Sequence, residues 1–164
     1  MEYTVRPYQH GEERYVAQAH RRIYSKEYHW GAVFIDYAEK IALDFAAKTK
    51  NDKEELWVAE KDGELIGCIM LCQTEEPPVG QLRLFLVEKN YRCYGVGSAL
   101  SKALLAKAKE AGYKELILWT ASPLTDAIHH YEKMGFHCIE KVPNRDWNIE
   151  GEMLYEVKMT MKLV

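Results

Sequence analysis

Several features that would assign a protein class at once are missing from this chain of 164 residues. No apolar run approaches the ~20 residues that span a bilayer, and the N-terminal stretch has no apolar core of a secretory signal. Lysines and arginines form no cluster, and the net charge is −3, so a nucleic-acid partner is not indicated. We therefore expect a cytoplasmic protein that binds neither membranes nor nucleic acids.

The chain also has no C-x-x-C pair among its four cysteines, although that spacing is typical of zinc and redox sites. Reduced thiols are expected, as in other cytosolic proteins. Cys68 and Cys72 lie four positions apart in an expected strand, so both face one side and are interpreted as small buried apolar residues. The spacing around His129 and His130 does not fit metal ligands. We predict no metal site.

The most informative stretch present is Gln81–Gly112, in which an apolar run is followed by a glycine loop and an amphipathic helix. The loop reads Arg-Cys-Tyr-Gly-Val-Gly, and the helix is expected to begin near Ser98. Backbone N–H groups of such a loop and of the first helical turn converge at the positive end of the helix dipole. Gly95 and Gly97 lack a Cβ, so a phosphate can approach the backbone closely. The stretch predicts a phosphate-binding loop.

Two common phosphate loops do not fit this pattern. A P-loop ends in Gly-Lys-Ser/Thr, whereas Gly97 precedes Ser98, and the dinucleotide fingerprint needs a third glycine where Leu100 stands. Arg-x-x-Gly-x-Gly after a strand instead resembles the pyrophosphate loop of the GCN5-related N-acetyltransferases (GNAT), which bind acetyl-CoA. A second segment, Tyr131–Phe136, resembles the Tyr-x-x-x-Gly-Phe signature of the same family. The two motifs in register make the resemblance specific.

Hydrophobic periodicity predicts the order β-α-α-β-β-β-α-β-α-β-β. Asp62-Gly63 between two apolar runs indicates a hairpin, because a type I′ turn needs positive φ at both central residues. Ser122-Pro123 is expected to start the last helix. The expected strands are 2–6, 56–59, 65–71, 82–87, 115–120, 136–142 and 152–161, and the expected helices are 12–24, 33–48, 98–111 and 122–134.

These elements predict an α/β fold of the mixed α+β type. Strand–helix–strand units around the glycine loop favour parallel pairing, whereas the hairpin and the last two strands favour antiparallel pairing. A central mixed, mostly antiparallel sheet with helices on both faces follows. The order matches the GNAT fold over essentially the whole chain, and we expect residues 1–164 to form a single N-acetyltransferase domain.

The resemblance implies acetyl-CoA as the cofactor and assigns residues to it. In the family, the two central strands splay apart around the pantetheine arm. The backbone of Phe85, Leu86 and Val87 is expected to bind that arm like an added strand. Arg92 stands at the loop's Gln/Arg position; a surface arginine that caps the turn is the alternative. The amides expected to hold the pyrophosphate belong to Cys93, Tyr94, Gly95, Val96, Gly97 and Ser98.

For the chemistry, the family places a tyrosine beside the sulfur of CoA, at the position of Tyr131. A phenol there can protonate the thiolate that leaves when an amine attacks the thioester; the alternative is an aromatic residue packed between helix and sheet. Many members have Asn seven positions earlier, reaching the cofactor arm, where this chain has Leu124. Some branches place a Glu base where Gln81 stands. Glu88 is either a base acting through water or a solvated turn carboxylate, so the base stays open.

The acceptor site of this fold is commonly walled by the segment between the first two helices. Glu27, Tyr28 and Trp30 are therefore candidates to hold a cationic amine, and Trp119 is a candidate for the same groove. Ordinary core packing is the alternative for each aromatic residue. The segment Ile23–Tyr28 and the Leu-Trp-Thr strand are also similar to acetyltransferase domains fused to MarR-type regulators.

Two functions follow from the resemblance. The first is an acetyl-CoA-dependent N-acetyltransferase that works by direct attack in a ternary complex. Its acceptor is a small-molecule amine, an amino-acid-like molecule or a protein amine, and a homodimer is left open. The second is a non-catalytic acetyl-CoA-binding or sensing module.

Overall fold

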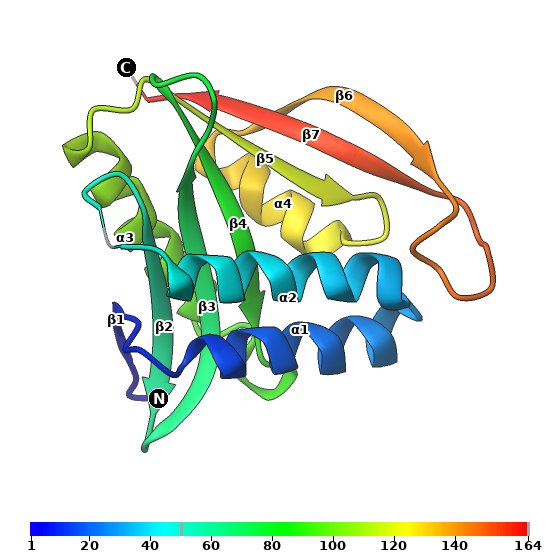
Figure 1. Cartoon of the computed structure of the whole chain (residues 1–164), viewed down its shortest axis with the longest axis horizontal. Coiled ribbons are helices and arrows are strands. Elements are labelled where there is room, and N and C mark those ends of the chain that lie inside the picture. Colours follow the sequence, from blue (N-terminus) through cyan, green and yellow to red (C-terminus); the bar gives the residue numbers. More distant parts are fainter. Residues whose placement is uncertain (50, 164) are drawn as a thin grey trace.

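Seven strands and four α-helices follow one another in the predicted order in the computed structural model, which describes residues 1–49 and 51–163 (Figure 1). A short 3-10 helix, Lys89–Tyr91, precedes the glycine loop. The strands are β1 (Thr4–Pro7), β2 (Glu55–Lys61), β3 (Glu64–Gln73), β4 (Val79–Val87), β5 (Glu115–Ala121), β6 (His137–Asn144) and β7 (Leu154–Lys162), and the helices are α1 (Glu13–Tyr28), α2 (Ala32–Ala47), α3 (Val96–Glu110) and α4 (Thr125–Met134).

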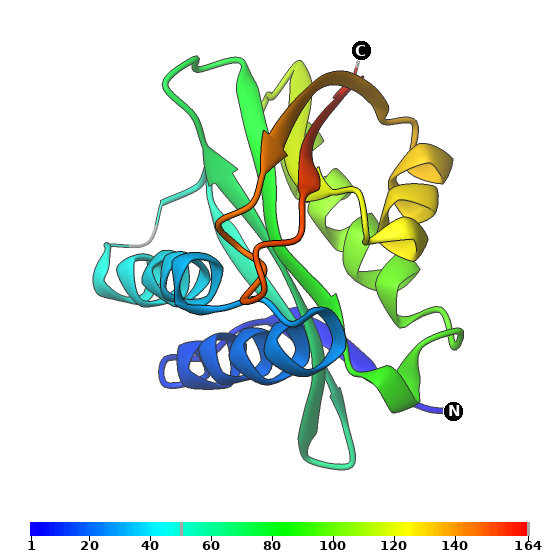
Figure 2. The same cartoon turned by 90° about the vertical axis from the view of Figure 1, so that its right-hand side faces the viewer.

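The strands form one sheet in the order β1-β2-β3-β4-β5-β7-β6. The pair β4–β5 is parallel, and the other neighbouring pairs are antiparallel. Helices α1 and α2 cover one face, and α3 and α4 cover the other (Figure 2). The predicted mixed, mostly antiparallel sheet with helices on both faces is confirmed.

The centre of the sheet is forked. Strands β4 and β5 pair only where Val79–Gln81 meet Glu115–Ile117. Beyond that point β4 continues beside β3, while β5 continues beside β7, and the two strands diverge (Figure 1). Among the described strands, the edge of β4 that faces β5 therefore has no partner from Leu82 onward, as the expected splay requires.

A β-bulge lies in β4 just past the fork. Met70 pairs with Arg83 and Cys68 pairs with Leu86, so β4 carries one extra residue between these pairs. Leu84, at the bulge, adopts the left-handed region with φ 51°, which costs a non-glycine residue about 1–3 kcal/mol. The bulge re-aims the strand: Leu84 packs toward α1 and α2, while the ring of Phe85 packs on the opposite face.

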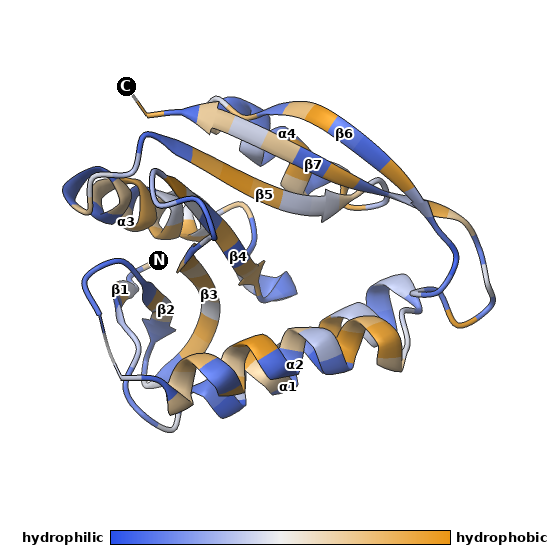
Figure 3. Ribbon diagram, turned by 45° about the horizontal axis from the view of Figure 1, so that its top comes forward, coloured by the Kyte–Doolittle hydropathy of each residue, from blue (hydrophilic) through white to orange (hydrophobic). Residues whose placement is uncertain are grey.

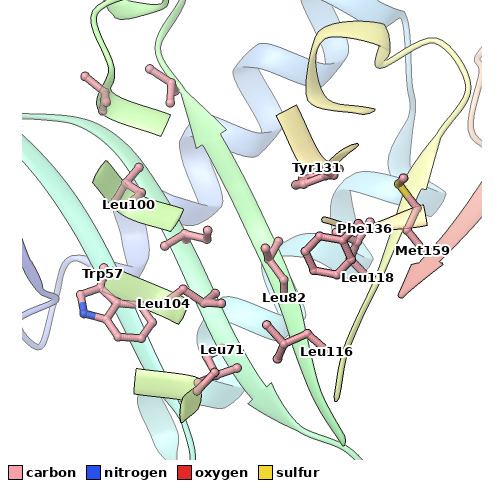
Figure 4. Close-up of a cluster of buried hydrophobic side chains, with 14 of the residues drawn as sticks. Trp57, Leu71, Leu82, Leu100, Leu104, Leu116, Leu118, Tyr131, Phe136 and Met159 are labelled. Carbon is pink, nitrogen blue, oxygen red and sulfur yellow. The ribbon is translucent and has the colours of Figure 1, made fainter. Parts of the chain in front are cut away.

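Two apolar clusters hold the helices on the sheet. On the α3–α4 face, Leu100 and Leu104 pack on the strands, with Tyr131 and Phe136 beside Leu118 (Figure 4). On the α1–α2 face lie the buried thiols that the sequence predicted, in a cluster with residues of both helices. Figure 3 shows apolar and polar bands alternating along α2, as in helices with one face on a sheet. Both faces are thus anchored around the fork.

Two local predictions have different outcomes. The turn at Asp62-Gly63 has φ values of 51° and 81°, which confirms the predicted hairpin. The predicted helix start at Ser122 is wrong, because α4 begins at Thr125. The Ser122 hydroxyl accepts a hydrogen bond from the Tyr155 N–H of β7 at 3.0 Å instead, so the serine is tied to the sheet rather than to the helix.

Candidate active site

The N-terminus of α3 forms a cradle of backbone N–H groups. Gly95 is the N-cap with φ 81°, and no side chain of residues 1–49 or 51–163 caps the helix. Cys93 is also left-handed, with φ 71°. In the described part of the chain, the amides of residues 93–98 have no hydrogen-bond acceptor, and the first intrahelical bond runs from Ala99 to the Gly95 carbonyl at 3.0 Å. Left-handed residues alternating before a helix form a nest for anions, so these residues fit a pyrophosphate.

The two glycines of the loop serve different needs. Gly95 has a positive φ, which glycine adopts without a steric penalty because it has no Cβ. At Gly97 the requirement is space, because an added Cβ would lie 3.1 Å from Cζ of Phe85. The ring of Phe85 also stacks on His130, with centroids 5.2 Å apart. Because position 97 has no side chain, the anion cradle can lie close to the free edge of β4.

Arg92 and Glu27, which the sequence assigned to the phosphate and to the acceptor, contact each other. Both terminal guanidinium nitrogens donate to the Glu27 carboxylate, at 2.8 and 3.1 Å, and Arg92 Nε donates to the Val87 carbonyl at 2.9 Å. The hydrogen bonds and the Glu27 charge outweigh burial and raise the pKa of Arg92. The pair ties the last turn of α1 to the end of β4. Tyr28, on the same turn, is half-exposed.

A cavity of about 490 Å³ occupies the fork. Its walls come from α1, α2, β4, β5, the N-cap and last turn of α4, the β6–β7 loop and β7. Glu27 and Tyr28 do not line it. The residues predicted from the sequence that do line it are Trp30, Phe85, Trp119, Leu124 and Tyr131.

Tyr131 lies at the inner wall of this cavity and is 6% exposed. Its ring is 5.9 Å from that of Phe85 and 6.0 Å from that of Phe136, centroid to centroid. Burial, with a smaller effect of the Tyr24 phenol, raises the pKa of Tyr131. The hydroxyl has no hydrogen-bond partner within the described residues. It is protonated at neutral pH, which is the state that a general acid needs.

Thr120 on β5 adds a second unsatisfied hydroxyl to the cavity. Among the described residues, its Oγ1 is buried without a hydrogen-bond partner, and the residue lines the cavity. A buried hydroxyl without a partner is uncommon in a packed core. Leu124, by contrast, packs against an apolar cluster that contains Trp30 and offers the cavity an apolar side chain.

The β6–β7 loop closes one end of the cavity against the α1–α2 connection. The Gly31 N–H donates to the Trp147 carbonyl at 2.7 Å, and the Ile149 N–H donates to the His29 carbonyl at 2.9 Å. Trp30 lies between the two segments, with its ring centroid 5.2 Å from that of Trp147. Sequence reasoning missed this loop, because nothing in its local pattern indicates which distant segment it meets.

The carboxylate that the sequence offered as a base, Glu88, is bound to neighbours. Two nitrogens of Arg22 donate to it at 2.8 and 2.9 Å, and the Tyr15 hydroxyl donates at 2.8 Å. Burial alone would raise the pKa of Glu88, but these hydrogen bonds and the Arg22 charge outweigh burial and lower that pKa. Glu88 is therefore an ion-pair partner of α1, and it does not line the cavity.

His20 is a cavity residue that the sequence did not single out. It is 3% exposed, and its Nδ1 donates to the Val16 carbonyl at 2.7 Å. Burial lowers the pKa of His20 to about 4. The ring is therefore neutral at physiological pH and presents a nitrogen without a proton.

The low pKa of His20 predicts a stability change at acid pH. Between a folded-state pKa of about 4 and the ordinary value of ~6.5, the unfolded chain binds more protons, so the free energy of unfolding falls as the pH falls. From about pH 7.5 to about pH 5, we expect wild type to lose about 2 kcal/mol more than a His20→Gln variant does. Urea unfolding at both pH values measures the difference. Equal losses in the two proteins would show that His20 titrates normally in the folded state.

The forked sheet, with an anion cradle at one side of the fork and a cavity within it, defines a fold of the acyl-CoA-dependent N-acyltransferase class. Residues 8–136 match the Acetyltransferase (GNAT) family. The chain belongs to this family, whose members use acetyl-CoA.

Individual proteins support this assignment. The chain is 35% identical over 106 residues to N-acetyltransferase family 8 member 2 of Rattus norvegicus. This alignment covers 60% of this chain and 47% of the relative. The chain thus spans about half the length of the curated relatives that it matches first. An acetyltransferase of the GNAT family from Staphylococcus aureus Mu50 has a TM-score of 0.81, with 18% identity and coverage of 99% of this chain and 100% of that chain.

The structure of yncA from Salmonella typhimurium with its cofactor acetyl-CoA has a TM-score of 0.77, with 15% identity and coverage of 100% of this chain and 95% of that chain. At these identities the two solved structures show the fold alone. Within residues 1–49 and 51–163, no helix is both long enough and apolar enough to cross a membrane.

Proposed function

We propose that the protein is an acetyl-CoA-dependent N-acetyltransferase that acetylates a primary amine by direct attack in a ternary complex. The observation that carries the proposal is the run of unpartnered amides at residues 93–98, beside a fork whose cavity holds a buried, protonated phenol. Anion binding and proton donation are both needed for acetyl transfer from CoA, and here they occur on adjacent elements.

Different residues bind the different parts of acetyl-CoA. The amides of residues 93–98 bind the pyrophosphate, and the backbone of Phe85, Leu86 and Val87, at the edge of β4 that faces away from β3, binds the pantetheine amides. Leu124 contacts the arm through its apolar side chain. Arg92 acts indirectly by holding the end of β4 through the Val87 carbonyl. When bound, acetyl-CoA supplies an acetyl group activated as a thioester.

Tyr131 is the proposed general acid. Its hydroxyl donates a proton to the sulfur that leaves, because the raised pKa keeps the phenol protonated until then. Gln81 lines the cavity where other branches place a glutamate, and Glu88 is bound by Arg22. The proton of the attacking ammonium therefore passes to water or to another cavity group, or the amine arrives partly neutral.

The non-catalytic acetyl-CoA-binding module is the second candidate, and the ion pair that occupies Glu88 favours it. One experiment separates the two functions: acetyl-CoA is titrated into the protein by calorimetry, and thiol release is then followed with a panel of amines. Binding with amine-dependent release supports the enzyme, whereas binding without release from any amine supports the module. No binding would contradict both candidates.

Other predictions go with this proposal. They are the similarity to domains fused to MarR-type regulators, a single domain over residues 1–164, a cytoplasmic location, the absence of a nucleic-acid partner and the homodimer. Gel filtration and limited proteolysis of the purified chain address the homodimer and the single domain.

A further inference from the structure

We propose that the acceptor is a zwitterion, an amino acid or close analogue with an apolar side chain, whose ammonium is bound by Glu156 and whose carboxylate is bound by Arg83. This inference rests on the proposed function and names its acceptor class. It is carried by two complementary charges that line one cavity and have no charged partner within the described residues.

Glu156 is the carboxylate of this cavity in the described chain. It lies on β7 directly opposite Ala121 of β5. Its Oε2 accepts a hydrogen bond from Asn144 Nδ2 at 3.2 Å. The amide orientation of Asn144 is fixed, because its Oδ1 accepts from the N–H groups of Asp146 and Trp147 at 2.8 and 3.1 Å. Asn144 thus holds Glu156 in place without neutralising it.

Arg83 is the guanidinium of the same cavity. It precedes the bulge in β4, reaches the Tyr37 hydroxyl of α2 at 3.5 Å, and also contacts the neutral thiol of Cys72. Arg22 and Arg92 differ from Arg83, because each donates two hydrogen bonds to one carboxylate. Arg83 has no carboxylate partner among the described residues, so its charge is available to a ligand.

The two groups come from opposite walls of the fork. Arg83 lies on β4 and Glu156 on β7, with β5 between these strands. Because β4 and β5 diverge beyond Gln81, the two backbones are farther apart here than the two strand spacings, about 10 Å, of a continuous sheet, and both side chains line the cavity between them. A ligand that bears an ammonium and a carboxylate satisfies both charges. A simple alkylamine would leave Arg83 unpaired, and a polyamine would bring a second cation toward it.

The other residues that line the cavity explain why the side chain of the acceptor is expected to be apolar. Apart from Arg83 and Glu156, the lining is dominated by aromatic and aliphatic residues. Tyr37 and Trp119 are 54% and 40% exposed at the cavity, so they can cover an apolar side chain from two sides. A volume of about 490 Å³ is within the range of pockets for small molecules.

The test compares phenylalanine with phenylalaninamide, which has the same size and an amine but no carboxylate. CoA release is measured for both acceptors at saturating acetyl-CoA. For wild type, we expect kcat/KM to be at least tenfold higher for phenylalanine. In Arg83→Gln that preference should fall to within about twofold, through loss of activity on phenylalanine alone, and Arg83→Lys should restore part of it. In Glu156→Gln both acceptors should lose at least tenfold.

Other outcomes overturn the inference. Equal use of the two acceptors by wild type, or an equal loss for both in Arg83→Gln, would assign Arg83 a structural role. Release of CoA from simple alkylamines but not from phenylalanine would reject the zwitterion while the proposed function stands. No release from any amine, despite binding of acetyl-CoA, would reject the enzyme and the inference together.

Discussion

Replacing Tyr131 by phenylalanine is expected to lower kcat by about 10²-fold or more, while the Kd of acetyl-CoA changes little. The substitution removes only the hydroxyl, which has no partner within the described residues. It keeps the ring and its contacts with Phe85 and Phe136, so the fold should persist. Steady-state CoA release at saturating concentrations of both substrates, together with calorimetric binding of acetyl-CoA, measures the two quantities.

Tyr113→Phe is the matched control. Tyr113 is also a buried phenol, 3% exposed, but its hydroxyl donates to the Lys53 carbonyl at 2.8 Å, outside the cavity. This control should lose stability, by about 1 kcal/mol for one hydrogen bond, and keep its kcat. A Tyr131→Phe protein that retains full kcat would leave Tyr131 only its packing role between α4 and the sheet.

The parts of the site that are local in sequence were predictable. The glycine loop, the hairpin at Asp62-Gly63 and the alternation of strands and helices each depend on residues a few positions apart. Steric limits on φ and the helix dipole act over that range. The same motifs predict the anion cradle, since residues 93–98 are consecutive and the geometry of a helix N-terminus leaves their amides unpaired.

The acceptor side was not predictable in the same way. Arg92 and Glu27 are 65 positions apart and were assigned to different ligands, yet they form one ion pair. Glu156 alternates with apolar neighbours in β7, and this pattern indicates a half-buried strand. The pattern does not indicate that the polar face of the strand lines a cavity. Such contacts depend on how α1, α2 and the β6–β7 loop converge on the fork.

The bulge at Leu84 joins the two sides of the site. Without it, β4 would present its side chains in strict alternation, because the side-chain period of a strand is two. The extra residue lets Leu84 face the α1–α2 layer while Phe85 faces Gly97 and α3. The bulge at this one strained residue therefore sets how the acceptor wall of the cavity and the anion cradle are placed relative to each other.

Introducing a carboxylate at Ser98 is expected to weaken acetyl-CoA binding at least tenfold, about 1.4 kcal/mol. Ser98 is exposed and is the third residue of α3. A glutamate there reaches back toward the free amides of the first turn and repels a pyrophosphate at the same place. Helix stability should not suffer, because an acidic residue in the first turn complements the dipole and α3 has none. Calorimetric titration and a thermal melt of Ser98→Glu measure both effects.

Ser98→Gln is the control that isolates charge, since it has the same size and the same reach. It should bind acetyl-CoA with nearly wild-type affinity, and its melting temperature should not exceed that of Ser98→Glu. Because Ser98→Glu is expected to be at least as stable as wild type, a loss of binding cannot be attributed to unfolding. If both variants bind acetyl-CoA equally well, the pyrophosphate does not contact the N-terminus of α3, and the amides of residues 93–98 must then be satisfied by water alone.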